Sequence, residues 1–302
     1  MNTNVNVKDV NILHHVGLVS SNMSALTECY ERLGFTLSPL SMPKVPLTPG
    51  GEPEILGAGN RCAIFQNNYL ELLGVVDKER WSNITKAQRG PYDIDVPLSR
   101  YEGLHVMHFG TDDIEATRTR LVKQGTPCSE ITPFQRNVDT PEGERIMHAK
   151  SLHFPYGVNP EALIQIAQHL TPELVFQPCY MHHANGAKRI TEIVVCVDDP
   201  KRYVDKYVAY TGHESKKVGN LDVIDLGFSR IIVTTPQNIN EIIPDCKLPV
   251  IPFLAGFTVA VCDLNSTQKF LIANHIPYLE HGGRLIVSST EACGCTLIFE
   301  NE

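Results

Sequence analysis

The sequence lacks the features that mark several large classes of protein. No apolar run in its 302 residues approaches the roughly 20 residues of a membrane-spanning helix. No block of five like charges occurs, and the formal net charge is −8, which argues against the basic stripe of a nucleic-acid-binding protein. The start, MNTNVNVKDV, has neither the basic beginning nor the apolar core of a signal peptide. We therefore expect a cytoplasmic protein without a membrane or nucleic-acid partner.

Closely spaced cysteine pairs are also nearly missing. The nine cysteines are an odd number and are scattered, which fits reduced thiols better than a disulfide framework. Cys293 and Cys295, in ACGCTL, form the only close pair. With no second pair of sulfurs beside it, this pair is more typical of a packed strand than of a zinc site.

Two domains are expected from the length, because soluble domains usually contain about 100–200 residues. A repeated unit supports this: a strand, an acidic or amide turn residue, an amphipathic helix, and then further strands. Four copies occur, at about 12–76, 103–169, 189–236 and 255–300. The sequence therefore predicts an α+β fold of four βαβββ modules in two halves, 1–172 and 173–302. The polar segment 78–100 is interpreted as a loop between the first two modules.

Helix-capping residues make the repeat visible. Twelve residues separate Asn22 from Gly34, and the same number separates Asp113 from Gly125. Asn and Asp side chains cap helix N-termini, and glycine commonly follows the last turn of a helix. The predicted capping residues of the four modules are Asn22, Asp113, Asp199 and Asp263.

Several stretches resemble the vicinal oxygen chelate superfamily, which includes glyoxalases and extradiol dioxygenases. HVGLVSSNM (15–23) is similar to the opening motif of that superfamily, and GLHVMHFGTDDIEA (103–116) to the start of its second module. QHLTPELVFQP (168–178) with HHANGA (182–187) is similar to a hallmark of bacterial glyoxalase-like domain proteins. The resemblance covers nearly the whole chain. It implies that paired modules form two half-barrels, each able to hold a metal or ligand in its concave face.

Strand alternation identifies the side chains that face such a site. In the first strand, Val16 and Leu18 form the packing face, so His15 lies on the other face. In YLELLGV, Leu70 and Leu72 form the packing face, so Glu71 lies opposite them. The resemblance places metal ligands at the positions of His15 and Glu71. We expect both side chains to face the concave side, with Glu71 as a ligand or, when displaced, as the catalytic base.

The second module offers weaker candidates. Val106 takes the place of His15, and Gln165 takes the place of Glu71. His108 has the parity of the concave face, whereas His105 reaches it only if a bulge intervenes. The predicted ligands are therefore His15, Glu71, Gln165 and His108, with His105 as the alternative to His108. Imidazole, carboxylate and amide donors suit zinc, iron, manganese or nickel.

The second half has no comparable set of donors. The matching positions are Glu192 in the third module and Gly256 and Phe299 in the fourth. One acid without a partner does not make a metal site. Extradiol dioxygenases of the resembled superfamily usually carry iron in this half, so that activity is disfavoured.

Plainer interpretations stay open for each residue. His15 could be an ordinary strand histidine, and Gln165 could be satisfied by water. Burial of the Glu71 carboxylate would cost free energy unless a cation, a basic side chain or water is beside it. His148 and His153 could line the same cavity, although an ordinary loop position is favoured. An N-cap-like or interdomain hydrogen bond is the simple role for the connector histidines His169, His182 and His183.

The leading functional hypothesis is a bacterial glyoxalase-like metalloenzyme, such as a lyase or isomerase, acting on a small oxygen-bearing substrate. Its divalent metal would polarise a carbonyl or stabilise an enolate. The alternative is a metal-free protein that binds or sequesters a small molecule on the same fold, and the third hypothesis is an extradiol dioxygenase. The expected partner is the small-molecule substrate, and a homodimer is allowed. The substrate and the reaction are not specified by the residues.

Overall fold

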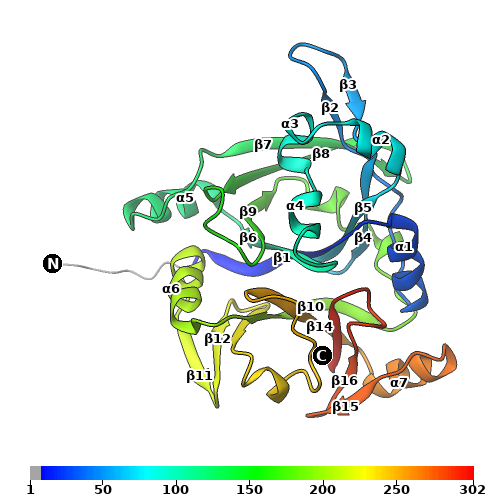
Figure 1. The fold of residues 1–302 in the computed structure, drawn as a ribbon, viewed down its shortest axis with the longest axis vertical. Helices are drawn as coiled ribbons and strands as arrows, with labels where there is room; N and C mark the ends of the chain where they lie inside the picture. The colour runs from blue at the N-terminus through cyan, green and yellow to red at the C-terminus, as the bar shows by residue number, and fades with distance from the viewer. Residues whose placement is uncertain (1–7) are drawn as a thin grey trace.

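The computed structural model describes residues 8–302, so most of the MNTNVNVKDV segment, with its expected lack of an export signal, lies outside the described residues. The strands form two strongly curled sheets, each made by two modules (Figure 1). The predicted α+β fold of four βαβββ modules in two half-barrels is confirmed. In the described part of the chain, no helix is long and apolar enough to cross a membrane.

The first sheet and its helices come from the first two modules. Their elements are β1 (Val10–Ser20), α1 (Met23–Arg32), β2 (Lys44–Pro46), β3 (Pro53–Ile55), β4 (Ala58–Ile64), β5 (Tyr69–Val75), β6 (Gly103–Thr111), α5 (Ile114–Lys123), β7 (Thr132–Thr140), β8 (Gly143–His153) and β9 (Leu163–His169). The strand order is β4-β5-β1-β6-β9-β8-β7. Strand β1 is parallel to β5 and antiparallel to β6, so it lies inside the sheet. The short β2–β3 hairpin stands apart from both sheets (Figure 1).

The second sheet repeats this arrangement with the last two modules. Its elements are β10 (Ala187–Cys196), α6 (Pro200–Thr211), β11 (Ser215–Val218), β12 (Leu221–Asp225), β13 (Arg230–Thr234), η4 (Ile239–Glu241), β14 (Phe253–Val261), α7 (Leu264–Ala273), β15 (Leu279–His281), β16 (Arg284–Val287) and β17 (Thr296–Asn301). The order is β11-β12-β13-β10-β14-β17-β16-β15. Strand β10 takes the place of β1, being parallel to β13 and antiparallel to β14.

Side-chain caps begin the four long helices, as the repeat predicts. Asn22 accepts a hydrogen bond from the Ala25 N–H at 3.2 Å, and Asp113 accepts one from Ala116 at 2.9 Å. Asp199 caps α6 in the same way, by accepting from Arg202, and Asp263 caps α7 by accepting from Asn265, two residues on. These bonds satisfy N–H groups that have no partner within the helix, so the strand-to-helix turns of all four modules are closed by a side-chain cap.

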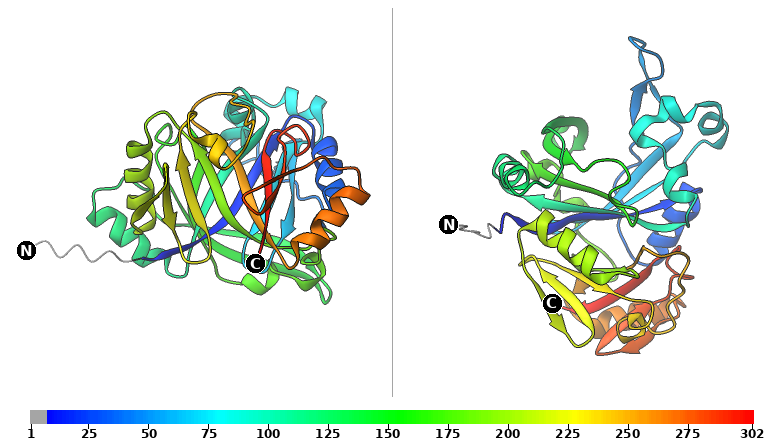
Figure 2. Two further views of the ribbon diagram at one scale, coloured as in Figure 1. Left: turned by 90° about the horizontal axis from the view of Figure 1, so that it is seen from below. Right: turned by 60° about the vertical axis from the view of Figure 1, so that its left-hand side comes forward.

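The two sheets lie back to back and share one hydrophobic core. Strand β1 lies against β10, and β6 lies against β14 (Figures 1 and 2). The packing faces of these strands join the buried faces of the long helices in one continuous cluster that contains Leu26, Tyr30, Ile193 and Phe257. The concave faces of both sheets therefore point away from the common core. The division of the chain at residue 172 stays a prediction.

Polar contacts also connect the two sheets. The Arg120 guanidinium of α5 forms an ion pair with Asp9 and donates to the carbonyls of Ala209 and Tyr210 at the end of α6. In the connector, which contains η2 (Pro172–Leu174) and η3 (Pro178–Tyr180), His183 accepts from the Thr36 N–H at 3.0 Å. The other ring nitrogen of His183 lies 2.9 Å from the Ile64 carbonyl. This buried histidine has the plain interdomain role expected for it.

The segment between the first two modules differs from the loop predicted for it. It contains α2 (Lys78–Asn83), α3 (Lys86–Arg89), η1 (Gly90–Tyr92) and α4 (Asp95–Leu98). Trp81 is buried, with the Arg89 guanidinium stacked 3.9 Å from its ring centroid. Trp81 packs with Val19 and Val75 in a separate hydrophobic cluster. The segment covers one end of the first concave face. Its polar composition gave no sign of these helices.

We expect Asn68→Ala to lower the free energy of unfolding by about 2–6 kcal/mol, because two buried backbone groups would each lose a partner at about 1–3 kcal/mol. The fully buried Asn68 side chain accepts from the Ile190 N–H at 3.0 Å and donates to the Ile190 carbonyl at 2.9 Å. Urea titration measures the loss. The control is Gln66→Ala, whose exposed side chain is lost while its backbone bond to Lys188 is retained. Equal stability of the two variants would contradict this role for Asn68.

Candidate functional site

The candidate residues of the first half come together on the concave face of the first sheet. His15 on β1 pairs with His108 on β6, and His108 pairs with Gln165 on β9. On the other side of β1, Glu71 of β5 pairs with Gly17, two residues from His15. Strand pairing places directly opposed side chains about 4.5–5.5 Å apart. Adjacent strands therefore bring the four predicted side chains into one row.

His15 and Glu71 each present one unengaged atom to the other. The Asn60 amide donates to Glu71 Oε1 at 2.5 Å, which leaves Oε2 free. The Nδ1 atoms of His14 and His15 lie 2.7 Å apart and share a hydrogen bond, which leaves His15 Nε2 free. His15 Nε2 and Glu71 Oε2 are 3.9 Å apart. This separation is too long for a direct hydrogen bond.

Burial keeps the imidazoles of this site neutral. Burial lowers the pKa of His15 well below its usual value, and the nearby His108 and His14 lower it further. Burial likewise lowers the pKa of His108 to about 3, with a smaller contribution from His153. A neutral imidazole keeps a nitrogen lone pair, which a metal ligand needs.

Glu71 lies in a less uniform environment. Burial raises the pKa of its carboxyl, while the hydrogen bond from Asn60 and the positive charge of Arg136 lower it. Burial, with a smaller contribution from the same guanidinium, lowers the pKa of His169 to about 4. Arg136 on β7 therefore lies near both sides of the concave face. Its positive charge is the one that acts on the Glu71 carboxylate.

His14 and His169 belong to this region, although neither was predicted as a site residue. The His14 ring lies 4.3 Å from the His169 ring, measured between centroids, and 5.5 Å from Tyr69. Tyr69 stacks on His15 at 4.5 Å. His14 joins its neighbour His15 on one face because the register of β1 with β6 shifts between Leu13 and His15. Two adjacent histidines in a strand were the only signal, and strand alternation assigns them to opposite faces.

Other histidines of the first two modules do not join His15. His105 stacks on Tyr101 at 4.0 Å between centroids, and its Nε2 lies 2.7 Å from the Tyr101 carbonyl. Its side chain is thus engaged on the packing side of β6, away from the alternative role considered for it. His148 is exposed on the opposite face of β8. His153 pairs with Gln165 and does border the concave face, with its Nε2 3.2 Å from Ser151 Oγ.

The donor set was tested for its fit to a metal ion. A gap of 3.9 Å between His15 Nε2 and Glu71 Oε2 is within the sum of two zinc–ligand bonds of about 2.0–2.2 Å each. His108 lies beside His15, with 4.2 Å between ring centroids. Across residues 8–302, however, no group of three His, Cys, Asp or Glu side chains is arranged to hold a metal. The site therefore fits as a two-donor site that needs an amide, water or substrate oxygen to complete it.

The second sheet uses the matching positions for ion pairs. Glu192, which corresponds to His15, is buried and pairs with Arg230 at 2.8 Å and Arg284 at 2.7 Å. It also accepts from the Thr258 hydroxyl at 2.8 Å, and Arg284 pairs again with Glu300 at 2.6 Å. The carboxylate oxygens of Glu192 are therefore already engaged. The matching positions of the second sheet thus form an ion-pair network.

One register assignment in the second half was wrong. Ile298, rather than Phe299, takes the place of Gln165, because Ile298 pairs with Thr258 as Gln165 pairs with His108. Phe299 is fully buried in the common core. The alternating run TLIFE offers apolar residues for both faces, so its composition does not show which face packs.

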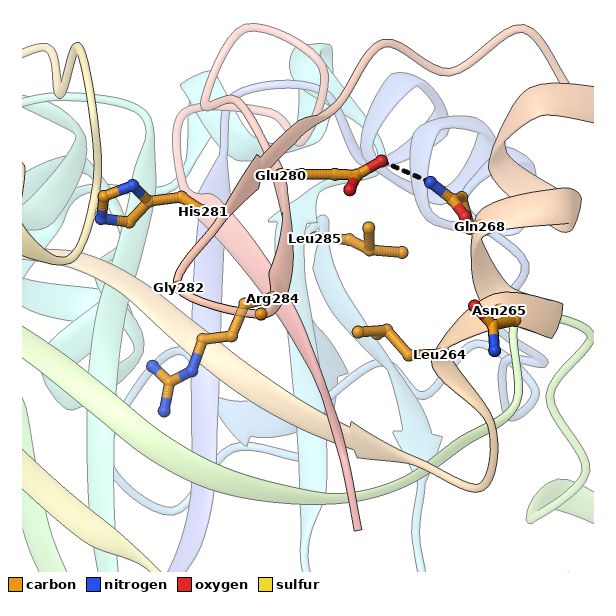
Figure 3. Close-up of a pocket in the computed structure, with 9 residues that line it drawn as sticks. Leu264, Asn265, Gln268, Glu280, His281, Gly282, Arg284 and Leu285 are labelled. Atoms are coloured by element: carbon orange, nitrogen blue, oxygen red, sulfur yellow. Dashed lines mark hydrogen bonds between the residues drawn. The ribbon is translucent and has the colours of Figure 1, made fainter.

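A separate hollow, whose lining includes His281, lies at the edge of the second sheet, away from His15 and Glu71. Its volume is about 250 Å³, and it is lined by α7 and the β15–β16 hairpin (Figure 3). Gln268 donates to Glu280 at 2.5 Å, and Leu264 and Leu285 contribute apolar side chains to the lining (Figure 3). The hollow holds no nucleophile or converging donor set, so the concave face of the first sheet is the better candidate site.

We expect Glu192→Gln to lower the free energy of unfolding by roughly 2–4 kcal/mol. Loss of one partner of a buried ion pair costs about 3–5 kcal/mol, and the part-exposed arginines reduce that loss. The control is Glu302→Gln, because Glu302 is exposed and lies 3.8 Å from Arg189. Urea titration should show a change of less than about 0.5 kcal/mol for the control. Two equally stable variants would contradict a structural role for Glu192.

Comparisons with known proteins agree with this fold. A family model described as a glyoxalase-like domain matches residues 13–211. No curated protein matches the chain. A hypothetical protein from Staphylococcus aureus has a similar structure, with a TM-score of 0.61 and 11% identity, over 96% of this chain and 99% of that one.

Two enzymes of known structure are also similar in fold. The Mn(II)-bound glyoxalase from Novosphingobium aromaticivorans has a TM-score of 0.52 and 11% identity, over 97% of this chain and 82% of that one. Homoprotocatechuate 2,3-dioxygenase from Arthrobacter globiformis has a TM-score of 0.54 and 10% identity, over 99% and 82%. At such identities the likeness shows the fold alone. From the family match over most of its length, this chain belongs to the glyoxalase-like domain family, and its fold is that of the vicinal oxygen chelate superfamily.

Proposed function

We propose that this chain is a metal-dependent enzyme that acts on a small oxygen-bearing organic substrate in the concave face of the first sheet. One observation carries the proposal: the unengaged atoms His15 Nε2 and Glu71 Oε2 face each other 3.9 Å apart. Imidazole and carboxylate donors together suit zinc, iron, manganese or nickel. The solved structure of an Mn(II)-bound glyoxalase with the same fold supports a metal in such a site.

His15 and Glu71 would be the principal ligands, and Gln165 the third and weaker one. Gln165 lies in the row next to His108, and within residues 8–302 its side chain has no hydrogen-bond partner. An amide oxygen is a neutral donor, so it adds less to the affinity than a carboxylate does. His108 is the alternative third ligand, because its neutral ring lies beside His15.

The residues of the concave face suit chemistry beside a carbonyl group. A divalent ion, when bound, would polarise a substrate carbonyl and stabilise enolate charge. When the substrate displaces the Glu71 carboxylate from the ion, Glu71 would take the proton from the carbon next to the carbonyl. Asn60 holds Oε1 in place, so Oε2 would be the oxygen that takes the proton. The positive charge of Arg136 near Glu71 would favour a substrate that carries negative charge.

Metal-free binding of a small molecule is the second candidate. It is favoured by the lack, among residues 8–302, of a three-residue group of His, Cys, Asp or Glu that could hold a metal. The dioxygenase hypothesis is weaker, since the arginines engage Glu192 and the remaining positions of the second sheet include Ile232 and Ile298. The cytoplasmic location and the homodimer stay predictions.

We expect His15→Ala and Glu71→Gln each to weaken binding of zinc or manganese at least tenfold, about 1.4 kcal/mol. The double variant should be hardly worse than the weaker single variant, because one ion needs both ligands and their effects are coupled. Titration in a weak chelator buffer gives the affinities. Elemental analysis of wild-type protein purified without chelator should show about one metal per chain.

The controls are His182→Ala and Glu79→Gln, which remove an exposed histidine and an exposed carboxylate. Both should bind metal as the wild type does. Wild-type affinity in the His15 and Glu71 variants would refute the metal site. Binding of a small organic anion by metal-free protein would then support the second candidate.

A further inference from the structure

The side chains of His14 and His15 are joined although they are neighbours in one strand. Neighbouring residues of a regular strand point to opposite faces. The shift in register between Leu13 and His15 inserts an additional residue into β1, which is the definition of a bulge. The result is a contact of 2.7 Å between the two Nδ1 atoms. A bulge that re-aims a side chain next to a site is a recurrent functional device.

A hydrogen bond between two Nδ1 atoms contains a single proton when both rings are neutral, which allows two arrangements. In the first, His15 carries the proton on Nδ1 and donates it to His14, so His15 Nε2 has a free lone pair. In the second, His14 donates, and the proton of His15 occupies Nε2. Only the first arrangement lets His15 Nε2 bind a cation beside Glu71.

The surroundings of the two rings bear on this choice. His15 Nε2 faces a carboxylate oxygen at 3.9 Å, and no protein atom lies between them as a hydrogen-bond partner. Within residues 8–302, His14 Nε2 is buried and has no hydrogen-bond partner. In the first arrangement the proton of the neutral His14 ring lies on this nitrogen, a cost that a cation bound at His15 Nε2 would offset. The His14 ring is instead enclosed by His169 and Tyr69, at 4.3 and 5.5 Å between centroids. Within residues 8–302, His14 thus has no side-chain hydrogen bond or ring contact outside the site that would explain a second buried imidazole.

We propose that His14 is a positioning residue, which accepts the Nδ1 proton of His15 and thereby presents the Nε2 lone pair of His15 to a metal ion held with Glu71. The proposal rests on the proposed metal site and deepens it. The partner of the second ring nitrogen of a ligating histidine determines which nitrogen binds the metal and in which direction the ring points. Such partners are usually carboxylates or carbonyls, and here a neutral imidazole takes that place without adding a buried charge.

Three variants of His14 test this role. His14→Leu removes the acceptor, His14→Phe removes it but keeps a ring against Tyr69 and His169, and His14→Asn restores an acceptor oxygen close to the position of Nδ1. We expect the Leu and Phe variants to bind zinc roughly 10–100-fold more weakly than the wild type. The Asn variant should recover to within about threefold of the wild type, an order-of-magnitude expectation from the same range. Urea titration of each variant confirms that it is folded.

Nitrogen-15 NMR gives a readout that does not depend on catalysis. In zinc-loaded wild-type protein, His15 should show a protonated Nδ1 and a metal-bound Nε2. In the Phe variant without metal, the proton of the neutral His15 ring should lie on Nε2, which faces the Glu71 carboxylate, because no acceptor faces Nδ1. The control is His148→Leu, which removes an exposed histidine from the opposite face of the sheet and should change neither measurement.

The outcomes separate this proposal from the metal site itself. If the His15 and Glu71 variants lose zinc affinity while His14→Leu and His14→Phe keep it, the metal site stands and the role of His14 is refuted. If the Asn variant is as weak as the Phe variant, acceptance of the Nδ1 proton is not what matters, and the role is also refuted. If no variant of His15, Glu71 or His14 changes zinc affinity, the proposed function fails together with this inference.

Discussion

The alternation of the central strand β1 is the constraint on which both the fold and the site depend. One face of β1 places Val16 and Leu18 in the core that joins the two sheets. The other face carries His15 towards the concave side, next to Glu71 across the parallel pair with β5. A shift of one residue would exchange the two faces, exposing the leucine and burying the imidazole in the core. The requirement of the core therefore also determines the orientation of the site.

Gly17 shows how closely the site is packed around this strand. A Cβ atom at this position would lie 3.0 Å from Val106 Cβ and 3.3 Å from Glu71 Cβ. Any side chain here would press on Glu71 of β5 and on Val106, the apolar residue at the position that corresponds to His15. Val106 thus fills the space opposite Gly17. His108, two residues further along β6, is the residue that pairs with His15. The two modules of the first sheet therefore differ at this position, where the first has His15 and the second has Val106.

Sequence periodicity predicted the parts that depend on local rules. The helix caps at Asn22 and Asp113 and the shared face of His15 and Glu71 follow from turn chemistry and strand alternation. The position of His14 could not be predicted in this way, because a bulge depends on how two strands pair and leaves almost no mark on either one. The burial of Trp81 was missed for a related reason: its cluster forms from distant strands and a segment of polar composition.

The two halves show how one fold position can serve stability or chemistry. At the position of His15 the second sheet has Glu192, and two arginines and a threonine engage its oxygens. Among the described residues, His15 has one hydrogen bond, to another imidazole, and a carboxylate 3.9 Å away, so the ring keeps an unused nitrogen. A buried polar atom without a partner lowers stability, and the second sheet shows that the fold can satisfy this position fully. The unsatisfied pair in the first sheet is the feature that the proposed ligand site would use.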